Sequence, residues 1–317
     1  MQTFNSADFK LGILGGGQLG KMLIQSAMDF GIEVHVLDPD YNASCSSYCH
    51  YFKVGSFNNY NDVYHFGQSP DVLTIEIENV NVEALRRLRD EGRHIFPQPE
   101  LIEMIQDKGL QKDFFVTHGI PTSPFIKIAD RKELEQHAGK FPAVQKLRKS
   151  GYDGRGVFMI NSTDDLPVAF NEPSILEERV DFEKELSVLV ARNQSGEVAT
   201  YDVVEMEFNS DANLVEILFS PARISPEMAR EAREIAIRII EKLGLVGLLA
   251  VEIFATRDGK LLVNELAPRP HNSGHHTIEA CVTSQYEQHL RAILNLPLGR
   301  TRLRSAAVMV NLLGAPG

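Results

Sequence analysis

Two glutamates lie in apolar segments near the carboxyl end of the sequence. Glu252 is in Val-Glu-Ile-Phe, Glu265 is in Leu-Val-Asn-Glu-Leu, and the turn Arg257-Asp258-Gly259-Lys260 separates them. If the segments pair as antiparallel strands, the two carboxylates meet on a half-buried surface, which is unfavourable unless a cation lies between them. Mg²⁺ suits such carboxylates and shares its remaining ligands with water and phosphates. The pattern predicts a Mg²⁺ site; the alternative is that each acid faces solvent.

A lysine and a glycine-rich loop suggest phosphate binding in the middle of the chain. Lys146 comes shortly before the run Ser150-Gly151-Tyr152-Asp153-Gly154-Arg155-Gly156. A lysine on a strand can neutralise phosphate oxygens while the N–H groups of a flexible glycine flap close over them. Charged side chains have little reason to occupy a mobile tip unless a ligand orders them, which makes Asp153 and Arg155 candidates for substrate contact. The alternative is a solvated lysine followed by a solvated hairpin turn.

Two further segments carry groups suited to a nucleotide and its acceptor. The run Ile175-Leu176-Glu177-Glu178-Arg179-Val180 leads from a strand into a linker, and Glu185 follows in the next strand. Backbone groups at such a hinge can read an adenine edge, and a nearby acid can accept from ribose hydroxyls, although charged linkers are common. The later loop Ala267 to His276 contains two prolines, which would hold Arg269 and His271 ready for a ligand. His275 and His276 are expected to be structural or to support the residues that contact the ligand.

The amino-terminal glycine pattern allows a different function. Gly15, Gly17 and Gly20 form G-x-G-x-x-G between a predicted strand and helix, and Asp38 ends the next strand. This arrangement is typical of dinucleotide-binding folds, in which the acid binds a ribose. Physically, the glycines only allow an anion to approach the start of a helix. A nicotinamide dehydrogenase is therefore one alternative, and Asp38 as the start of a turn with Pro39 is another.

The elements around these residues predict α/β and α+β architecture. Strands are expected at 10–14, 33–37, 51–54 and 72–77 with helices between them, which indicates a parallel sheet. A proline-rich turn near 97–99 then precedes a single helix at 100–118. From 143 onwards short strands alternate with glycine turns, including a hairpin around the flap. The remaining predicted elements are a helix at 226–243 and strands at 247–255 and 261–266.

The bulk composition argues against several classes of protein. Lys plus Arg is 32 and Asp plus Glu is 43, which gives a net charge of −11 and no basic footprint for nucleic acid. No segment approaches the roughly 20 apolar residues of a membrane span, so we expect a cytoplasmic protein without a membrane partner. The three cysteines cannot all pair and are expected to be reduced. Cys45, Cys49 and His50 are a weak alternative metal site, because no fourth ligand is evident.

Seven motifs in chain order resemble the ATP-grasp superfamily and, within it, the 5-(carboxyamino)imidazole ribonucleotide synthetases, the ATPase-subunit type of phosphoribosylaminoimidazole carboxylase. They extend along nearly the whole chain. GYDGRG and APRPHNSGH are the specific ones, since sister enzymes share the hinge and the paired acids. The motifs are GGGQLGKM, TIEIENV at Thr74 to Val80, DKGLQK at Asp107 to Lys112, GYDGRG, EERV, VEIF and NELAPRPHNSGH.

The resemblance implies an ATP-grasp fold that follows an amino-terminal parallel α/β (pre-ATP-grasp) domain. The domain with the glycine loop is expected at 1–99, the small ATP-grasp subdomain with the flap at 100–175, and the large subdomain with the Mg²⁺-binding acids at 176–297. Residues 298–317 would begin a carboxyl-terminal domain. ATP and Mg²⁺ are the implied cofactors.

The resemblance also assigns roles residue by residue. The metal ligands would be Glu252 and Glu265, and the catalytic residues Asp153, Arg155, Arg269 and His271. The ribonucleotide or bicarbonate would meet Gln18, Leu19, Glu76, Tyr152 and Asn272. ATP would be bound by Lys108, Lys146, Gly151, Tyr152, Gly154, Gly156, Glu177, Glu178, Arg179, Val180, Glu185, Asn264 and Glu265.

The implied reaction uses ATP and bicarbonate to form carboxyphosphate, which then carboxylates the exocyclic amine of aminoimidazole ribonucleotide in purine biosynthesis. A cytoplasmic homodimer is expected. The alternatives are another ATP-grasp carboxylate–amine ligase, such as a formate-dependent glycinamide ribonucleotide transformylase, the dehydrogenase mentioned above, and a nucleotide-binding regulator without turnover.

The carboxyl end departs from the family pattern. Members normally continue for several tens of residues, including a basic stretch that helps to hold the ribonucleotide phosphate, whereas this sequence stops at Gly317. The apolar run Ala306 to Leu313 is expected to be a strand whose partners are missing. Recognition of the phosphate, more than the ATP chemistry, is left open by this difference.

Overall fold

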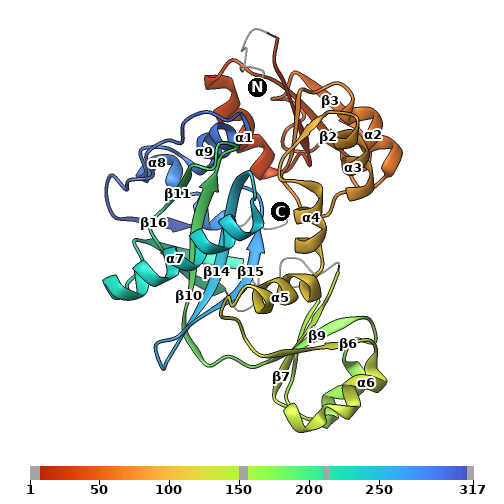
Figure 1. Ribbon diagram of the computed structural model, residues 1–317, viewed down its shortest axis with the longest axis vertical. Helices are drawn as coiled ribbons and strands as arrows, with labels where there is room; N and C mark the ends of the chain where they lie inside the picture. The colour runs from red at the N-terminus through yellow and green to blue at the C-terminus, as the bar shows by residue number, and fades with distance from the viewer. Residues whose placement is uncertain (1–7, 150–155, 210–213, 313–317) are drawn as a thin grey trace.

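The computed structural model describes residues 8–149, 156–209 and 214–312. Three sheets organise these residues (Figure 1). The amino-terminal sheet lies at the top of the view, a small sheet lies at the lower right, and the largest sheet lies between them on the left. The mixed α/β and α+β fold predicted from the sequence is confirmed.

The amino-terminal sheet is parallel, with strand order β3-β2-β1-β4-β5. Four of the five residues of β1 are buried, as expected for a parallel strand with helices on both faces. Separate apolar clusters fill the two sides of the sheet. The elements are β1 (Lys10–Leu14), α1 (Gln18–Asp29), β2 (Glu33–Asp38), β3 (Tyr51–Val54), α2 (Tyr60–Gly67), β4 (Val72–Ile75), α3 (Val82–Asp90) and β5 (His94–Ile95).

Two helices, α4 (Pro99–Gln106) and α5 (Lys108–Thr117), stand where the sequence predicted one. The prediction of a continuous helix is wrong because Asp107 is extended, with φ −116° and ψ 104°. Its carboxylate accepts hydrogen bonds from the N–H groups of Gly109 and Leu110, so it caps a new helix. Aspartate is favoured at such a cap because it satisfies N–H groups that have no partner within the helix.

The small sheet is antiparallel, with strand order β6-β9-β7-β8. The predicted hairpin around the flap is confirmed, since β7 pairs antiparallel with β8 and Lys146 lies opposite Val157. A satellite core, which includes Ile128 and Leu134, covers one face of this sheet. The elements are β6 (Phe125–Ile128), α6 (Arg131–Gln136), the 3₁₀ turn η1 (Ala138–Lys140), β7 (Ala143–Leu147), β8 (Val157–Ile160), the 3₁₀ turn η2 (Thr163–Val168) and β9 (Ser174–Glu178).

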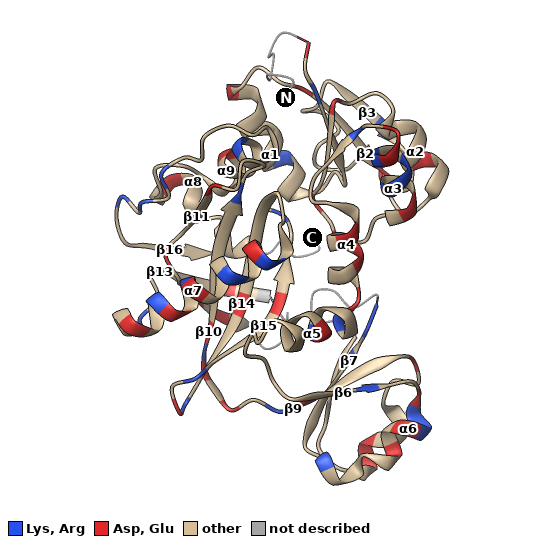
Figure 2. Cartoon of the chain, in the orientation of Figure 1, with Lys and Arg blue, Asp and Glu red and all other residues tan. Residues whose placement is uncertain are grey.

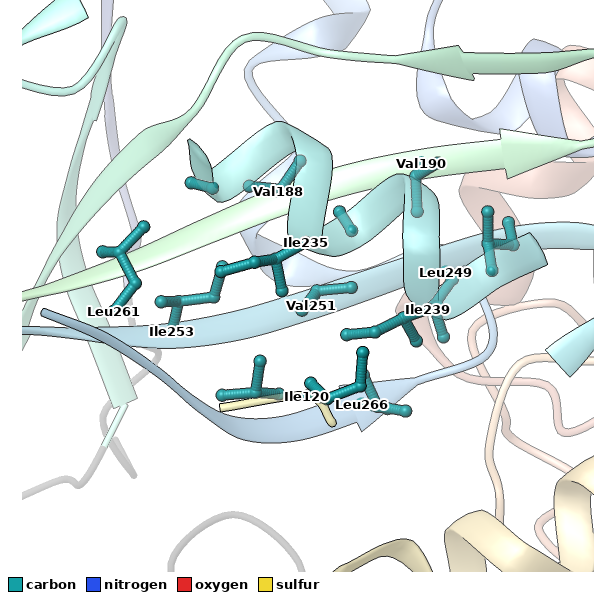
Figure 3. Packing of buried hydrophobic residues seen from close by; sticks show 14 of the residues in the cluster. Ile120, Val188, Val190, Ile235, Ile239, Leu249, Val251, Ile253, Leu261 and Leu266 are labelled. Carbon is teal, nitrogen blue, oxygen red and sulfur yellow. The ribbon is translucent and has the colours of Figure 1, made fainter. Parts of the chain in front are cut away.

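The large sheet has the strand order β15-β14-β10-β12-β13-β16, and β11 pairs with β10. Figure 3 shows α7 lying across this sheet, with Ile235 and Ile239 packed against Val188, Leu249 and Val251. The elements are β10 (Phe182–Arg192), β11 (Val198–Thr200), β12 (Val204–Asn209), β13 (Leu214–Ser220), α7 (Pro226–Leu243), β14 (Gly247–Thr256), β15 (Leu261–Ala267), the 3₁₀ turn η3 (Asn272–Gly274), α8 (Thr277–Ala280), α9 (Gln285–Ile293) and β16 (Ala307–Val310).

The expectation that the run near residue 306 lacks strand partners is wrong. β16 pairs antiparallel with β13, and Val308 lies opposite Phe219. The two strands are far apart in the sequence, so no local pattern could reveal their pairing. Val308 and Val310 remain more than half exposed although their strand is paired.

The described surface is mixed in charge. Figure 2 shows acidic and basic residues interspersed on helices such as α3 and α7. Among the described residues, no helix is long and apolar enough to cross a membrane.

Candidate active site

The paired acids face each other across the β14–β15 hairpin. Glu252 lies directly opposite Glu265 in the strand register, as the sequence pattern predicted. Their side chains are 21% and 43% exposed, so neither is freely solvated. Burial, followed by the nearby charge of Glu265, raises the pKa of Glu252 to about 8. The donor set fits Mg²⁺, which binds to one or two carboxylates and fills its other positions with water and phosphate oxygens.

Two lysines from other elements reach this hairpin. Lys108, the first residue of α5, places Nζ 2.5 Å from Oε1 of Glu265. Lys146 of β7 donates to Oδ1 of Asn264 at 2.8 Å and lies 2.7 Å from Oε2 of Glu177. Burial raises the pKa of Glu265, but Lys108 outweighs it and holds that pKa below its usual value. Lysines from α5 and from the small sheet therefore meet at one hairpin of the large sheet, where Lys108 pairs with Glu265 and Lys146 bonds Asn264. Such a cluster of cations suits the phosphates of ATP.

A clamp that the sequence did not reveal connects α5 with β7. Arg148 donates from Nε and Nη2 to the two carboxylate oxygens of Asp107, at 2.8 and 2.7 Å. The carbonyl oxygen of Arg148 also accepts from the N–H of Lys108 at 2.9 Å. A bidentate arginine–carboxylate pair fixes orientation as well as distance. The clamp therefore sets the position of Lys108 relative to Lys146.

The predicted adenine hinge is placed beside these lysines, but not all of it is accessible. The side chain of Glu177 is 4% exposed and sealed between lysines, and the N–H of Glu178 already donates to the carbonyl of Pro124. Arg179 is exposed and Val180 is half-buried. Burial raises the pKa of Glu185 to about 7, although Lys146 lowers it. Contacts of these residues with adenine and ribose stay predictions.

The N–H groups of the glycine loop donate hydrogen bonds to carboxylates of the same domain. Glu76 accepts from the N–H groups of Gly17 and Gly20 at 2.7 and 2.6 Å, so its carboxylate occupies the start of α1. Asp38 accepts from the N–H groups of Gly16 and Asp40. The glycine loop and Asp38, which suggested a dinucleotide site, thus bind to groups of the protein itself. Asp38 also starts a turn. This geometry weighs against the dehydrogenase.

Gln18, Leu19 and Glu76 stay predictions for substrate contact. Gln18 is exposed at the first position of α1, and Leu19 is half-buried beside it. Glu76 can serve a substrate only in addition to the two N–H groups that it already binds.

The proline-stiffened loop joins the amino-terminal domain to the paired acids. Nε of Arg269 lies 2.8 Å from Oε1 of Glu78, and Nε2 of His271 lies 3.6 Å from Oε1 of Glu252. Nδ1 of His271 accepts from the N–H of Ser273 at 3.3 Å, which places the ring proton on Nε2. Burial, with a smaller effect of Arg269, lowers the pKa of His271 to about 3. His271 is therefore a neutral donor that points towards the acids.

Two amide side chains that sequence reasoning missed hold this loop, and Gln285 is fully buried. Gln285 accepts from the N–H of His271 and donates to its carbonyl oxygen, both at 2.8 Å. Asn311 donates from Nδ2 to Oδ1 of Asn272 at 3.0 Å and to the carbonyl of Val215 at 2.6 Å. The amide group of Asn272 is therefore oriented with its oxygen towards Asn311. Neither residue belonged to a segment that suggested chemistry.

Most of the predicted flap lies outside the described residues, namely Gly151, Tyr152, Asp153, Gly154 and Arg155. Gly156 is described, with φ +79°, and its carbonyl accepts from the N–H of Leu147 at 2.8 Å. The positive φ explains why a glycine stands directly before β8.

The cysteine-rich alternative has no geometric support. Nδ1 of His50 accepts from the N–H of Val34 and is not available to a metal in this state. Across the described ranges, no group of three or more His, Cys, Asp and Glu side chains is arranged so that it could hold a metal ion without ligands from elsewhere. Cys45 and Cys49 are free, and burial raises the pKa of both thiols.

Comparison with known proteins agrees with the geometry. A family model for the ribonucleotide synthetase preATP-grasp domain matches residues 9–106, and one for the ATP-grasp domain matches residues 113–286. The N5-carboxyaminoimidazole ribonucleotide synthase of Bacillus subtilis is 39% identical over 311 residues, covering 96% of this chain and 81% of that protein. The chain belongs to the N5-carboxyaminoimidazole ribonucleotide synthase family.

Solved structures of this synthase family superpose closely. The synthetase from Thermotoga maritima is 46% identical, with a TM-score of 0.89, and the match covers 98% of this chain and 82% of that one. A synthase from Aspergillus clavatus, solved in complex with ADP and 5-aminoimidazole ribonucleotide, is 33% identical with a TM-score of 0.91, covering 99% of this chain and 84% of that one.

The length of the synthase relatives differs from that of this chain. The chain spans just over half of the plant and yeast phosphoribosylaminoimidazole carboxylases that it matches, 55% and 56% of their length. The domain boundaries expected at residues 99, 175 and 297 stay predictions.

Proposed function

We propose that this protein is an ATP-dependent carbon–nitrogen ligase that carboxylates the exocyclic amine of 5-aminoimidazole ribonucleotide with bicarbonate. The observation that carries the proposal is the convergence of two lysines on the hairpin that holds the opposed acids Glu252 and Glu265. Lys108 pairs with Glu265, and Lys146 donates to the neighbouring Asn264. That arrangement suits a Mg²⁺-bound triphosphate better than hydride transfer. The Aspergillus clavatus relative solved with ADP and the same ribonucleotide supports the choice of substrate.

The proposed reaction has two steps. An oxygen of bicarbonate attacks the γ-phosphorus of ATP, ADP leaves, and carboxyphosphate forms. The amine nitrogen of the ribonucleotide then attacks the carboxyl carbon, phosphate leaves with the electrons of the broken C–O bond, and the nitrogen loses a proton. The products are N5-carboxyaminoimidazole ribonucleotide, ADP and phosphate.

The chain's own residues would supply alignment and charge neutralisation. Phosphoryl transfer needs these more than covalent catalysis, and Lys108 and Lys146 are placed to meet the phosphates. Mg²⁺ held by Glu252 and Glu265 would neutralise further charge on the triphosphate. His271, a neutral donor 3.6 Å from Glu252, and Arg269 are placed to orient the small carboxylate.

The deciding experiment is an ATPase assay with bicarbonate, with and without 5-aminoimidazole ribonucleotide, in which product is followed with ¹³C-bicarbonate. The proposal expects ADP release that the ribonucleotide stimulates, together with ¹³C in the product. Activity with formate and glycinamide ribonucleotide instead would identify the formyl-transferring alternative, and ATP binding without turnover would identify a regulator. A homodimer in the cytoplasm stays part of the proposal; light scattering of the purified protein tests the dimer.

A further inference from the structure

Lys112 is a buried lysine in the second turn of α5, directly below Lys108 on the same face of the helix. Its side chain is 3% exposed. Nζ donates to Oγ1 of Thr122 at 2.6 Å and to Oγ of Ser123 at 3.0 Å, and it lies 2.5 Å from Oε1 of Glu177. The two hydroxyls use two of the three N–H donors of the ammonium group, and the carboxylate of Glu177 lies within ion-pair distance of it. Lys112 is therefore sealed from any bound nucleotide.

Glu177 lies between two cations. Its Oε1 faces Lys112 and its Oε2 lies 2.7 Å from Lys146, while its own side chain is 4% exposed. Burial alone would raise the pKa of Glu177, but Lys146 and Lys112 outweigh it and lower that pKa, so the carboxylate is ionised. Burial lowers the pKa of Lys112, and the charge of Glu177 opposes that shift. With both lysines protonated, two lysines and one glutamate carry one net positive charge.

We propose that Lys112 is a positioning residue for the nucleotide: it neutralises Glu177 and thereby leaves the charge of Lys146 available to the phosphates. The inference rests on the proposed use of ATP. Without Lys112, the group of Lys146 and Glu177 would be neutral, and the buried carboxylate would hold Lys146 as its only cation. In a partly buried site such an attraction is stronger than at the surface, so it competes with phosphate binding.

The chain offers a matched control. Lys127 of β6 pairs with Asp113, which is also on α5, but the two side chains are 39% and 47% exposed. This pair has the same chemistry and connects the same helix to the same sheet. An exposed ion pair of this kind contributes little to stability.

The test compares the affinities of Mg²⁺–ATP and of adenosine, measured by titration calorimetry. Lys112→Met should weaken ATP binding on the order of tenfold, since one unit of charge near the phosphates is lost, and should change adenosine binding less than about twofold. Lys127→Met should change neither. The double variant Lys112→Met with Glu177→Gln removes both charges and should recover ATP affinity to within about threefold of wild type, because Lys146 is free again.

Several results would overturn the inference. Equal losses of affinity for ATP and adenosine in Lys112→Met would show that Lys112 has only a structural role. Unchanged ATP affinity would show that Lys112 does not affect nucleotide binding. Failure of the double variant to recover would show that charge balance is not the cause. If Lys112→Met does not fold, as judged by circular dichroism, the double variant decides alone, because it buries no unpaired carboxylate. None of these measurements requires the ribonucleotide, so failure of the proposed carboxylation would appear separately in the turnover assay.

Discussion

One buried histidine joins two domains and predicts how the protein responds to acid. His289 of α9 is fully buried. Its Nδ1 accepts from the N–H of Leu248 on β14 at 3.2 Å, and its Nε2 lies 2.9 Å from Oγ1 of Thr74 on β4. Because Nδ1 has to accept, the ring proton is on Nε2, which donates to Thr74. Burial lowers the pKa of His289 to about 4, so the ring is neutral in the folded protein at neutral pH.

The size of the effect follows from linkage. An unfolded histidine titrates near pH 6.5, so between about pH 6.5 and pH 4 the unfolded chain binds a proton that folded His289 does not. Stability therefore falls as the pH drops through this window and is unaffected above it. These two pKa values give a loss of about 2 kcal/mol between pH 8 and pH 5. In His289→Gln this contribution is absent, although the variant should be less stable at pH 8 by roughly 1–3 kcal/mol, because buried partners lose hydrogen bonds.

Urea unfolding at pH 8 and pH 5 measures this difference. The stability gap between wild type and His289→Gln should shrink by about 2 kcal/mol at the lower pH. Other buried histidines, such as His271, are present in both proteins and cancel. His65→Gln, at an exposed position, should follow the wild-type pH dependence within about 0.5 kcal/mol. Parallel pH dependences of wild type and His289→Gln would refute the reasoning.

Three further predictions concern charged groups. Glu265→Gln should lower ATP turnover roughly 100-fold or more with the fold intact, since a carboxylate beside the phosphates is lost; normal Mg²⁺-dependent turnover in a steady-state assay would contradict the metal assignment. Burial would raise the pKa of Glu205, but hydrogen bonds from Arg223 and Lys184 lower it to about 2. Glu205→Gln should therefore cost on the order of 2 kcal/mol in urea unfolding at pH 7, allowing for the half-exposed Arg223, and the cost should vanish as the pH falls from about 4.5 to 2. Arg148→Lys should raise the Michaelis constant for ATP several-fold, because a lysine cannot form the bidentate clamp; an unchanged constant would count against the clamp.

Local signals explain which elements could be predicted. The predicted bounds of α7, Pro226 and Leu243, are confirmed. They could be predicted because the residues that begin and end the helix lie directly beside it in the sequence. Ser225 caps the first turn, proline suits the first helical position, and Gly244 ends the helix with φ 61°. The opposition of Glu252 and Glu265 was predictable for the same reason, since a short turn joins their strands.

Long-range partners explain what could not be predicted. The break between α4 and α5 is at Asp107, whose carboxylate binds to Arg148, directly after β7 of the small sheet. Lys112 is the clearest case of a missed residue, because a lysine in an amphipathic helix is normally exposed. Its partner Glu177 lies on β9, and only the folded chain brings the two together. The motif DKGLQK contains Lys112, but the family resemblance assigns a role only to its Lys108.

The amino-terminal glycine loop shows why a motif can indicate two functions. G-x-G-x-x-G requires only that an anion meets the free N–H groups at the start of a helix. In this chain Glu76 is that anion, because it accepts from both Gly17 and Gly20. A side chain added at Gly17 would approach Oε1 of Glu76 to 2.8 Å, so the glycine is needed for an internal contact. The pattern therefore reports the close packing of β4 against α1, and ligand specificity has to come from exposed side chains such as Gln18.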